Sequence, residues 1–219
     1  MYSAAPIPEF QLKYFSRDIK IQSDVILDTE FEGADIMMEW EREIMRDAAE
    51  LICQNGGDIL NVGFGMGIID SYIEEHRPRT HWIIEAHPEV QKKMIADGWL
   101  QKPHVRCIFK PWQEVIYHLP KFDGIYFDTW DDHQDNFDRN VHNLLKEDGI
   151  FSFFNNPAQS QRYKDGEPGF YIKEHHSEIL EQHCNIDFVH KIIETDIPEG
   201  LDYWSSTNKS YHHPIITKK

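Results

Sequence analysis

The chain has 219 residues, a length that allows one well-cored domain with a short extension but not two full domains. Apolar residues make up 40% and aromatic residues 13% of it, which excludes intrinsic disorder over most of the length. The net charge of −16, from 38 acidic and 22 basic residues, would repel a phosphate backbone, so nucleic acid is not an expected partner.

The cysteines and the apolar runs of the sequence indicate in which cellular compartment the protein lies. Cys53, Cys107 and Cys184 are far apart, odd in number and without a CxxC pair, which is typical of a reducing compartment. No stretch reaches the ~18 uncharged apolar residues of a membrane span, and the first residues lack the basic and apolar regions of a signal peptide. We therefore expect a cytoplasmic protein without membrane contact. The sequence does not indicate its oligomeric state.

Residues 1–34 differ in pattern from the rest of the chain. They mix aromatic residues and prolines with a β-rich run at 25–27. We interpret this segment as an arm that folds onto a domain spanning 35–219. Mobile segments often close over a substrate, so we expect the arm to act as a lid, with Tyr14 and Phe15 as substrate contacts.

From residue 35 onward, apolar residues alternate between helical and strand periods. The pattern predicts helices over 35–51, 68–75, 88–97, 136–145 and 171–183. It predicts strands over 59–62, 80–84, 105–109, 122–128, 150–154, 186–193 and 211–217. This alternation indicates an α/β fold with a mostly parallel, seven-stranded, Rossmann-like sheet covered on both faces, in which the last two strands could form an antiparallel hairpin.

A glycine-rich turn, Gly63-Phe64-Gly65-Met66-Gly67, directly follows the strand at 59–62 and opens the next helix. A dinucleotide fingerprint needs G-x-G-x-x-G, but Ile68 occupies the position of its third glycine, and no Gly-Lys-Ser/Thr follows for a P-loop. The G-x-G-x-G spacing resembles the first motif of class I S-adenosylmethionine-dependent methyltransferases. Glu85 ends the next strand, where a carboxylate can accept hydrogen bonds from both hydroxyls of a ribose.

A resemblance to one enzyme group is carried by runs at 38–41 (MEWE), 61–70 (NVGFGMGIID), 85–88 (EAHP), 112–113 (WQ), 122–129 (FDGIYFDT) and 151–155 (FSFFN). These runs strongly resemble the catalytic domain of the fungal type IV (delta-N) protein arginine methyltransferases and, more loosely, guanidinoacetate N-methyltransferase. Both methylate guanidino groups with S-adenosylmethionine. The resemblance implies the class I methyltransferase fold and this cofactor, and it places the guanidino-binding carboxylates at Glu41 and Asp128.

The residues themselves agree with these two positions. In the expected helix 35–51, Glu41 shares an i, i+4 stripe with Met37 and Met45, so it borders the apolar face. Asp128 ends the fourth strand, at the sheet edge where ligands bind in this class. A planar guanidinium offers five donors in a fixed fork, which suits two carboxylates. We expect Glu41 and Asp128 to act as catalytic residues that orient the guanidinium first and accept a proton second.

The remaining site predictions fall into two sets. For the cofactor we expect contacts from Gly63, Phe64, Gly65, Met66, Gly67, Glu85, Ala86, Trp112, Gln113 and Asp128. For the substrate we expect contacts from Tyr14, Phe15, Trp40, Glu41, Met45, Thr129, Trp130 and Asn155. The tryptophans Trp40, Trp112 and Trp130 offer aromatic walls for adenine, sulfonium or guanidinium.

Several alternatives remain open. The protein-modifying fungal enzymes carry an N-terminal repeat region that this sequence lacks, so we expect a free guanidino compound such as arginine, with protein arginine as the alternative. A non-catalytic cofactor-binding module is a further alternative, against which the carboxylate pair argues. Residues 155–157 (NNP) follow the fifth strand, so they do not indicate the Asn-Pro-Pro-aromatic site of amide and base N-methyltransferases. Mg²⁺ ligation is conceivable at Asp128, Asp131, Asp132 and His133, but we expect no metal.

Overall fold

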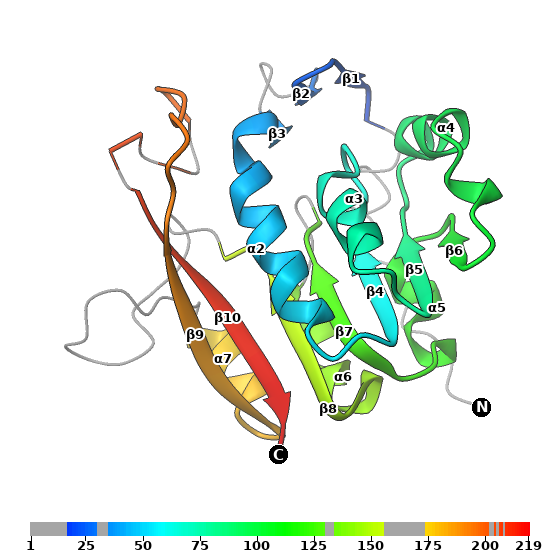
Figure 1. Cartoon of the computed structure of the whole chain (residues 1–219), viewed down its shortest axis with the longest axis vertical. Helices are drawn as coiled ribbons and strands as arrows, with labels where there is room; N and C mark the ends of the chain where they lie inside the picture. The colour runs from blue at the N-terminus through cyan, green and yellow to red at the C-terminus, as the bar shows by residue number, and fades with distance from the viewer. Residues whose placement is uncertain are drawn as a thin grey trace.

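The computed structural model describes residues 17–29, 35–129, 134–155, 174–201, 204, 206–207 and 209–219. Its main element is a seven-stranded sheet in the order β6-β5-β4-β7-β8-β10-β9 (Figure 1). The strands are β4 (Asp58–Val62), β5 (Thr80–Ile84), β6 (Val105–Ile108), β7 (Phe122–Phe127), β8 (Leu145–Phe153), β9 (Cys184–Ile192) and β10 (Ser210–Lys218). The first five are parallel, whereas β10 pairs antiparallel with β8 and β9. The expected α/β fold and the expected terminal hairpin are both confirmed.

Helices cover both faces of this sheet. Apolar side chains of α2 (Arg42–Cys53) and α3 (Ile68–Glu75) pack on one face, and α4 (Pro88–Ala96) packs on the same face near β5. The opposite face carries α5 (Trp112–Val115), α6 (Gln134–Leu144) and α7 (Glu174–Leu180). Short 3-10 turns lie at η1 (Glu39–Glu41), η2 (Trp99–Gln101) and η3 (Ile116–His118). None of the helices in the described ranges has the length and hydropathy that crossing a bilayer requires.

A second, smaller sheet precedes the main one. Its antiparallel strands are β1 (Ile19–Ile21), β2 (Val25–Asp28) and β3 (Asp35–Met38), and Figure 1 shows it at the top of the molecule, beyond the N-terminal end of α2. The prediction of a helix over 35–51 is therefore wrong at its start, because residues 35–38 form a strand. Pairing with β2 satisfies the backbone groups of this segment, and such long-range pairing overrides a helical apolar pattern.

The boundaries of two other elements differ from expectation. The strand predicted at 150–154 begins earlier, at Leu145, where the ammonium of Lys146 donates to the Asp58 and Asp123 carboxylates at 2.9 and 2.6 Å. These ion pairs join the starts of β4, β7 and β8 at the edge of the sheet opposite to the glycine-rich turn. The helix predicted at 171–183 spans Glu174–Leu180 within the described residues.

Candidate active site

A pocket opens at the carboxyl ends of β4, β5 and β7, where small-molecule sites commonly lie in α/β folds. It lies at the edge of the sheet where ligands bind in open α/β folds. Its walls come from the glycine-rich turn, the ends of three strands, the loop before α5 and the small N-terminal sheet. The residues that line it are Ile19, Ile26, Ile36, Met37, Val62, Gly63, Phe64, Gly65, Ile69, Ile84, Glu85, Ala86, Val90, Lys110, Pro111, Trp112, Gln113, Asp128 and Thr129.

The glycine-rich turn requires glycine for two reasons. Gly63, Gly65 and Gly67 have φ values of 96°, 54° and 77°, which other residues rarely adopt. In addition, a Cβ on Gly63 would lie 1.8 Å from the Asp128 carbonyl oxygen, and one on Gly65 would lie 2.5 Å from the Met37 sulfur. The turn therefore passes close to the end of β7 and to β3, and its backbone forms one wall of the pocket.

Glu85 holds this turn in place. One oxygen of its buried carboxylate accepts the backbone N–H of Phe64 at 2.9 Å, and the other accepts the N–H of His87 at 2.6 Å. Burial raises the pKa of Glu85, while these backbone donors act in the opposite direction. Each carboxylate oxygen has a second acceptor site, so the group can also accept from a ligand in the pocket.

Two orphaned polar atoms fit the predicted cofactor. Gln113 Oε1 and Thr129 Oγ1 are buried and have no hydrogen-bond partner among the described residues, and both residues line the pocket. A buried acceptor without a donor is unfavourable, and a ligand carrying an amino group and hydroxyls would satisfy both atoms. Trp112 adds an apolar wall, fixed by edge contacts with Phe127 and Phe137 at centroid distances of 6.0 and 5.3 Å. The residues present therefore fit S-adenosylmethionine.

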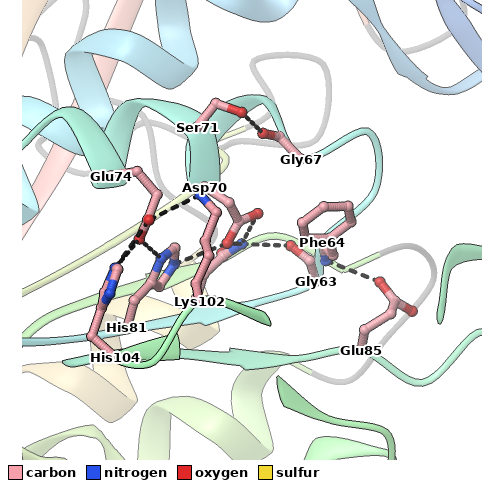
Figure 2. Close-up of polar contacts among 11 residues, drawn as sticks. Gly63, Phe64, Gly67, Asp70, Ser71, Glu74, His81, Glu85, Lys102 and His104 are labelled. Atoms are coloured by element: carbon pink, nitrogen blue, oxygen red, sulfur yellow. Dashed lines mark hydrogen bonds and ion pairs between the residues drawn. The ribbon is translucent and has the colours of Figure 1, made fainter. Parts of the chain in front are cut away.

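Behind the turn, a chain of polar contacts leads from the pocket to the surface (Figure 2). The buried amide of Asn61 donates to the Gly63 carbonyl at 2.9 Å and to both Asp70 carboxylate oxygens at 3.0 and 2.9 Å. His81 lies between Asp70, 3.0 Å from Nε2, and Glu74, 2.9 Å from Nδ1. Lys102 and His104 contact Glu74 from outside.

This network was not predicted from the sequence. His81 is fully buried, and its flanking carboxylates raise its pKa although burial alone would lower it, so we assign it as an imidazolium. Bonds from its partners lower the pKa of Glu74 to about 2 despite partial burial. The available signal was the i, i+4 spacing of Asp70 and Glu74, which places both acids on one face of α3.

Residue counting along β7 and α2 places both predicted catalytic carboxylates toward the carboxyl end of β7. A Cβ on Gly124 of β7 would lie 2.0 Å from the Ile52 carbonyl, which shows where α2 packs against this strand. From that contact, β7 rises roughly 13 Å to Asp128. The α2 axis, which runs antiparallel to β7, rises about 16 Å to Glu41. Glu41 is buried just before α2, whereas Asp128 is partly buried and lines the pocket; Glu41 itself is not one of the lining residues.

Electrostatic contacts agree with this convergence. Burial, Tyr211 and the negative charges of Asp128 and Glu41 together hold the pKa of the Tyr126 hydroxyl well above its usual range. The same two carboxylates act on Tyr211. Burial raises the pKa of Asp128 to about 7, and no cation among the described residues offsets it. A buried carboxyl of this kind favours a positively charged ligand.

The other predicted site residues are distributed as follows. Trp40 is buried against Trp204, with ring centroids 5.3 Å apart, and Met45 is fully buried beneath Glu41. Asn155 is buried, and its backbone N–H donates to the Tyr211 hydroxyl at 2.8 Å. Met66 donates its N–H to the Met37 sulfur at 3.2 Å, and Gly67 precedes α3; neither lines the pocket. Tyr14, Phe15, Trp130, Asp131, Asp132 and His133 lie outside the described residues.

The small N-terminal sheet contributes to the pocket in a way that the sequence did not reveal. Ile19, Ile26 and Ile36 line the same pocket as the glycine-rich turn. Within this sheet region, Arg17 forms an ion pair with buried Asp28 at 3.0 Å. His87 Nε2, next to α4, lies 3.0 Å from the Arg17 carbonyl and so connects the small sheet to the main domain. The arm is therefore a wall of the pocket through its described residues.

Comparison with protein families agrees with these features. A family model described as guanidinoacetate N-methyltransferase matches residues 20–211. A protein arginine N-methyltransferase 2 of Saccharomyces cerevisiae is 33% identical over 94% of this chain and 53% of its own length. A protein of the same name from Eremothecium gossypii is 44% identical over 55% of this chain and 32% of its own length. The chain thus spans about a third to a half of the length of the curated relatives it matches.

Solved structures confirm the fold. A precorrin-6y C5,15-methyltransferase from Geobacter metallireducens aligns with a TM-score of 0.57 at 13% identity, covering 84% of this chain and 90% of that one. An S-adenosylmethionine-dependent methyltransferase from Clostridium acetobutylicum aligns with a TM-score of 0.51 at 16% identity, covering 80% and 91%. At such low identity these matches establish the class I methyltransferase fold alone.

Proposed function

The chain belongs to the guanidinoacetate N-methyltransferase family, and from this premise we propose that it transfers a methyl group from S-adenosylmethionine to a nitrogen of a guanidino group. The observation that supports the proposal is that the charges of Glu41 and Asp128 act on the same two buried hydroxyls, those of Tyr126 and Tyr211, while Asp128 lines the pocket. A desolvated carboxylate is unfavourable in a folded protein unless a cation or hydrogen-bond donors offset its charge. A guanidinium is the ligand that would satisfy both, because its planar fork forms charge-assisted paired hydrogen bonds with carboxylates.

The cofactor, when bound, supplies the methyl group as an electrophile. The glycine-rich turn and Glu85 would hold it, with Gln113 and Thr129 as further hydrogen-bonding groups. Glu41 and Asp128 would then fix the guanidino plane so that one nitrogen faces the methyl group. Positioning two reactants in this way can supply most of the rate enhancement of a transfer reaction.

Proton transfer falls to the carboxylate with the raised pKa. A guanidinium has a pKa above 12, so no carboxylate can deprotonate it fully before attack. As the N–C bond forms, the methyl–sulfur bond of the cofactor would break and S-adenosylhomocysteine would leave; the methylated nitrogen then becomes acidic and its proton can move to an adjacent carboxylate oxygen. We assign this role to Asp128, because a pKa of about 7 makes it a better proton acceptor than an ordinary aspartate.

The substrate could be a free guanidino compound such as arginine, or an arginine in a protein, as the names of the relatives suggest. The excess of acidic residues favours a cationic substrate in either case. We also propose a reducing, cytoplasmic setting, which the free thiols of Cys53, Cys107 and Cys184 support.

The test is incubation with methyl-labelled S-adenosylmethionine and a panel of acceptors. The panel contains free arginine, guanidinoacetate, arginine-containing peptides, and lysine or simple amines as controls. We expect label transfer to at least one guanidino compound and none to the amines. Whether the label appears on a free compound or on a peptide shows which kind of substrate the enzyme uses. Transfer only to oxygen or carboxylate acceptors would overturn the guanidino assignment and leave the fold.

A further inference from the structure

The hydroxyl of Tyr126 is a buried polar group that the fold leaves unsatisfied. Tyr126 lies in β7 with no exposed surface, and its hydroxyl has no hydrogen-bond partner among the described residues. Buried tyrosine hydroxyls usually have a hydrogen-bond partner, because an unmade hydrogen bond in the interior is unfavourable. A phenylalanine at this position would fill the same space without an unsatisfied hydroxyl. Stability of the fold therefore does not explain why a tyrosine is present here.

The position of Tyr126 places this hydroxyl near the two carboxylates. Asp128 directly follows β7 and lies two residues after Tyr126; its backbone N–H donates to the Val62 carbonyl of β4 at 2.9 Å, which continues the strand pairing, so we place both side chains on the same face of the sheet. On that face Tyr126 packs in one cluster with Met37 and Met45, which flank Glu41 in the chain. The tyrosine therefore lies close to both carboxylates, and the charges of Asp128 and Glu41 both act on its hydroxyl.

The second tyrosine of this region, Tyr211, has a different environment. It packs with Trp40 and Ile44, the other neighbours of Glu41, and its hydroxyl accepts the backbone N–H of Asn155 at 2.8 Å. Its oxygen thus has a structural bond, whereas that of Tyr126 has none in the described part of the chain. The charges of Asp128 and Glu41 reach both hydroxyls and keep both phenols protonated.

We propose that the Tyr126 hydroxyl is a third polar contact of the guanidino group, a specificity-determining group beside Glu41 and Asp128. This inference rests on the proposed function and deepens it. The hydroxyl oxygen accepts one guanidino N–H, and its own proton turns to a carboxylate oxygen. The five N–H donors of the planar guanidinium can then bond to three acceptor groups, the hydroxyl and the two carboxylates. A primary amine has a single nitrogen and cannot bond to all three in the same geometry.

The test compares Tyr126→Phe with the wild type in three measurements. We expect the KM for the guanidino acceptor to rise about tenfold or more with a smaller change in kcat, because the contact exists in both the bound substrate and the transition state. Affinity for S-adenosylhomocysteine, measured by calorimetry, should stay within about twofold. The melting temperature should stay equal or rise, because the change removes an unsatisfied hydroxyl.

Two control variants make the result interpretable. Ser152 of β8 lies beside Tyr126 in the sheet, and its hydroxyl is also buried and unpartnered within the described residues, but its short side chain stays at the level of the strand. Ser152→Ala should leave the KM unchanged. Tyr211→Phe should lower the melting temperature, because the Asn155 N–H loses its acceptor.

The outcomes separate the two levels of the proposal. If the wild type methylates a guanidino compound and Tyr126→Phe does so with the same KM, the role of Tyr126 is wrong and the proposed function stands. A loss of melting temperature in Tyr126→Phe together with lost cofactor affinity would also overturn it, since the hydroxyl would then be structural. If the wild type neither binds nor methylates any guanidino compound, the proposed function fails and the role of Tyr126 fails with it.

Discussion

The carboxylate of Glu85 accepts the backbone N–H of Phe64 at 2.9 Å, so the acid at the end of β5 holds the glycine-rich turn that follows β4. Its second oxygen accepts the N–H of His87 at the start of α4. A single side chain therefore joins the turn, the strand end and the next helix around the pocket. If the cofactor's ribose also binds here, Glu85 both shapes the site and contacts the ligand.

Glu85→Ala is expected to weaken S-adenosylhomocysteine binding by about 1–3 kcal/mol, the usual effect of removing one partner of a buried hydrogen bond. Glu85→Gln keeps one acceptor oxygen and should lose less. Calorimetry measures both values, with exposed Glu89→Gln as the control because the Glu89 carboxylate pairs with Lys92 at the surface. Equal affinity in wild type and Glu85→Ala would contradict a role for Glu85 in binding.

Local patterns predicted the main sheet well, because its elements depend on nearby residues. The strand at 58–62, the positive-φ glycines and the helix at 68–75 follow one another in the chain, and each limits the conformation of the next. The same holds for Glu85, whose position could be predicted from the end of its strand alone. The glycine-rich turn at 63–67, which forms one wall of the pocket, could therefore be predicted from the sequence.

Features that depend on distant pairing were not predicted. Residues 35–38 form a strand only because β2 offers a pairing edge, and no local period indicates that edge. His81 is an imidazolium only because α3 places Asp70 and Glu74 on either side of it. The arm was predicted as a substrate lid, which stays a prediction; that Ile19 and Ile26 line the pocket beside the glycine-rich turn had no signal in the sequence. Each of these contacts depends on the packing of whole elements.

His81→Gln should lower the free energy of unfolding by about 3–5 kcal/mol near neutral pH, because it removes the charge between buried Asp70 and partly buried Glu74. The pKa of His81 in the folded protein is raised above 6.5, so its stabilisation is complete below pH 6.5 and declines as the pH rises through the raised value. The difference between variant and wild type should therefore shrink at alkaline pH.

Urea unfolding followed across the pH range measures this difference. His76→Gln, at the exposed end of α3, is the matched control and should change stability by less than about 0.5 kcal/mol. A pH-independent difference would show that His81 is neutral in the folded protein, contrary to its assignment as an imidazolium.

Asp28→Asn is expected to loosen the small N-terminal sheet, because it removes the charge that pairs with Arg17. Hydrogen exchange should become faster at residues 19–28 and stay slow at 58–62 in the main sheet. Since Ile19 and Ile26 line the pocket, affinity for S-adenosylhomocysteine should fall several-fold. Asp24→Asn, in the exposed turn between β1 and β2, serves as the control. Unchanged exchange and affinity would mean that other contacts hold the sheet.

Asp128 should give the reaction a pH dependence that its amide variant lacks. Its pKa of about 7 in the folded protein exceeds the ordinary 3.8, so the free enzyme holds a proton there between these values. The carboxylate form binds the cationic substrate, and kcat/KM should therefore rise with pH and level off above about 7. Stability should change in the opposite direction, falling as the pH rises from about 4 to 7, because the folded state binds the extra proton.

Glu41→Gln and Asp128→Asn test the carboxylate pair directly. Each variant keeps the size of the side chain but removes a charge that holds the guanidinium, so kcat/KM should fall by more than about tenfold while cofactor binding persists. In Asp128→Asn, the rise of kcat/KM with pH up to about 7 should also disappear, and above that pH the variant should be more stable than the wild type. Because both carboxylates act on one planar group, the loss in the double variant should be smaller than the sum of the single losses in free energy. Wild-type rates on arginine or guanidinoacetate in both single variants would contradict the assignment of these two residues to the guanidino site.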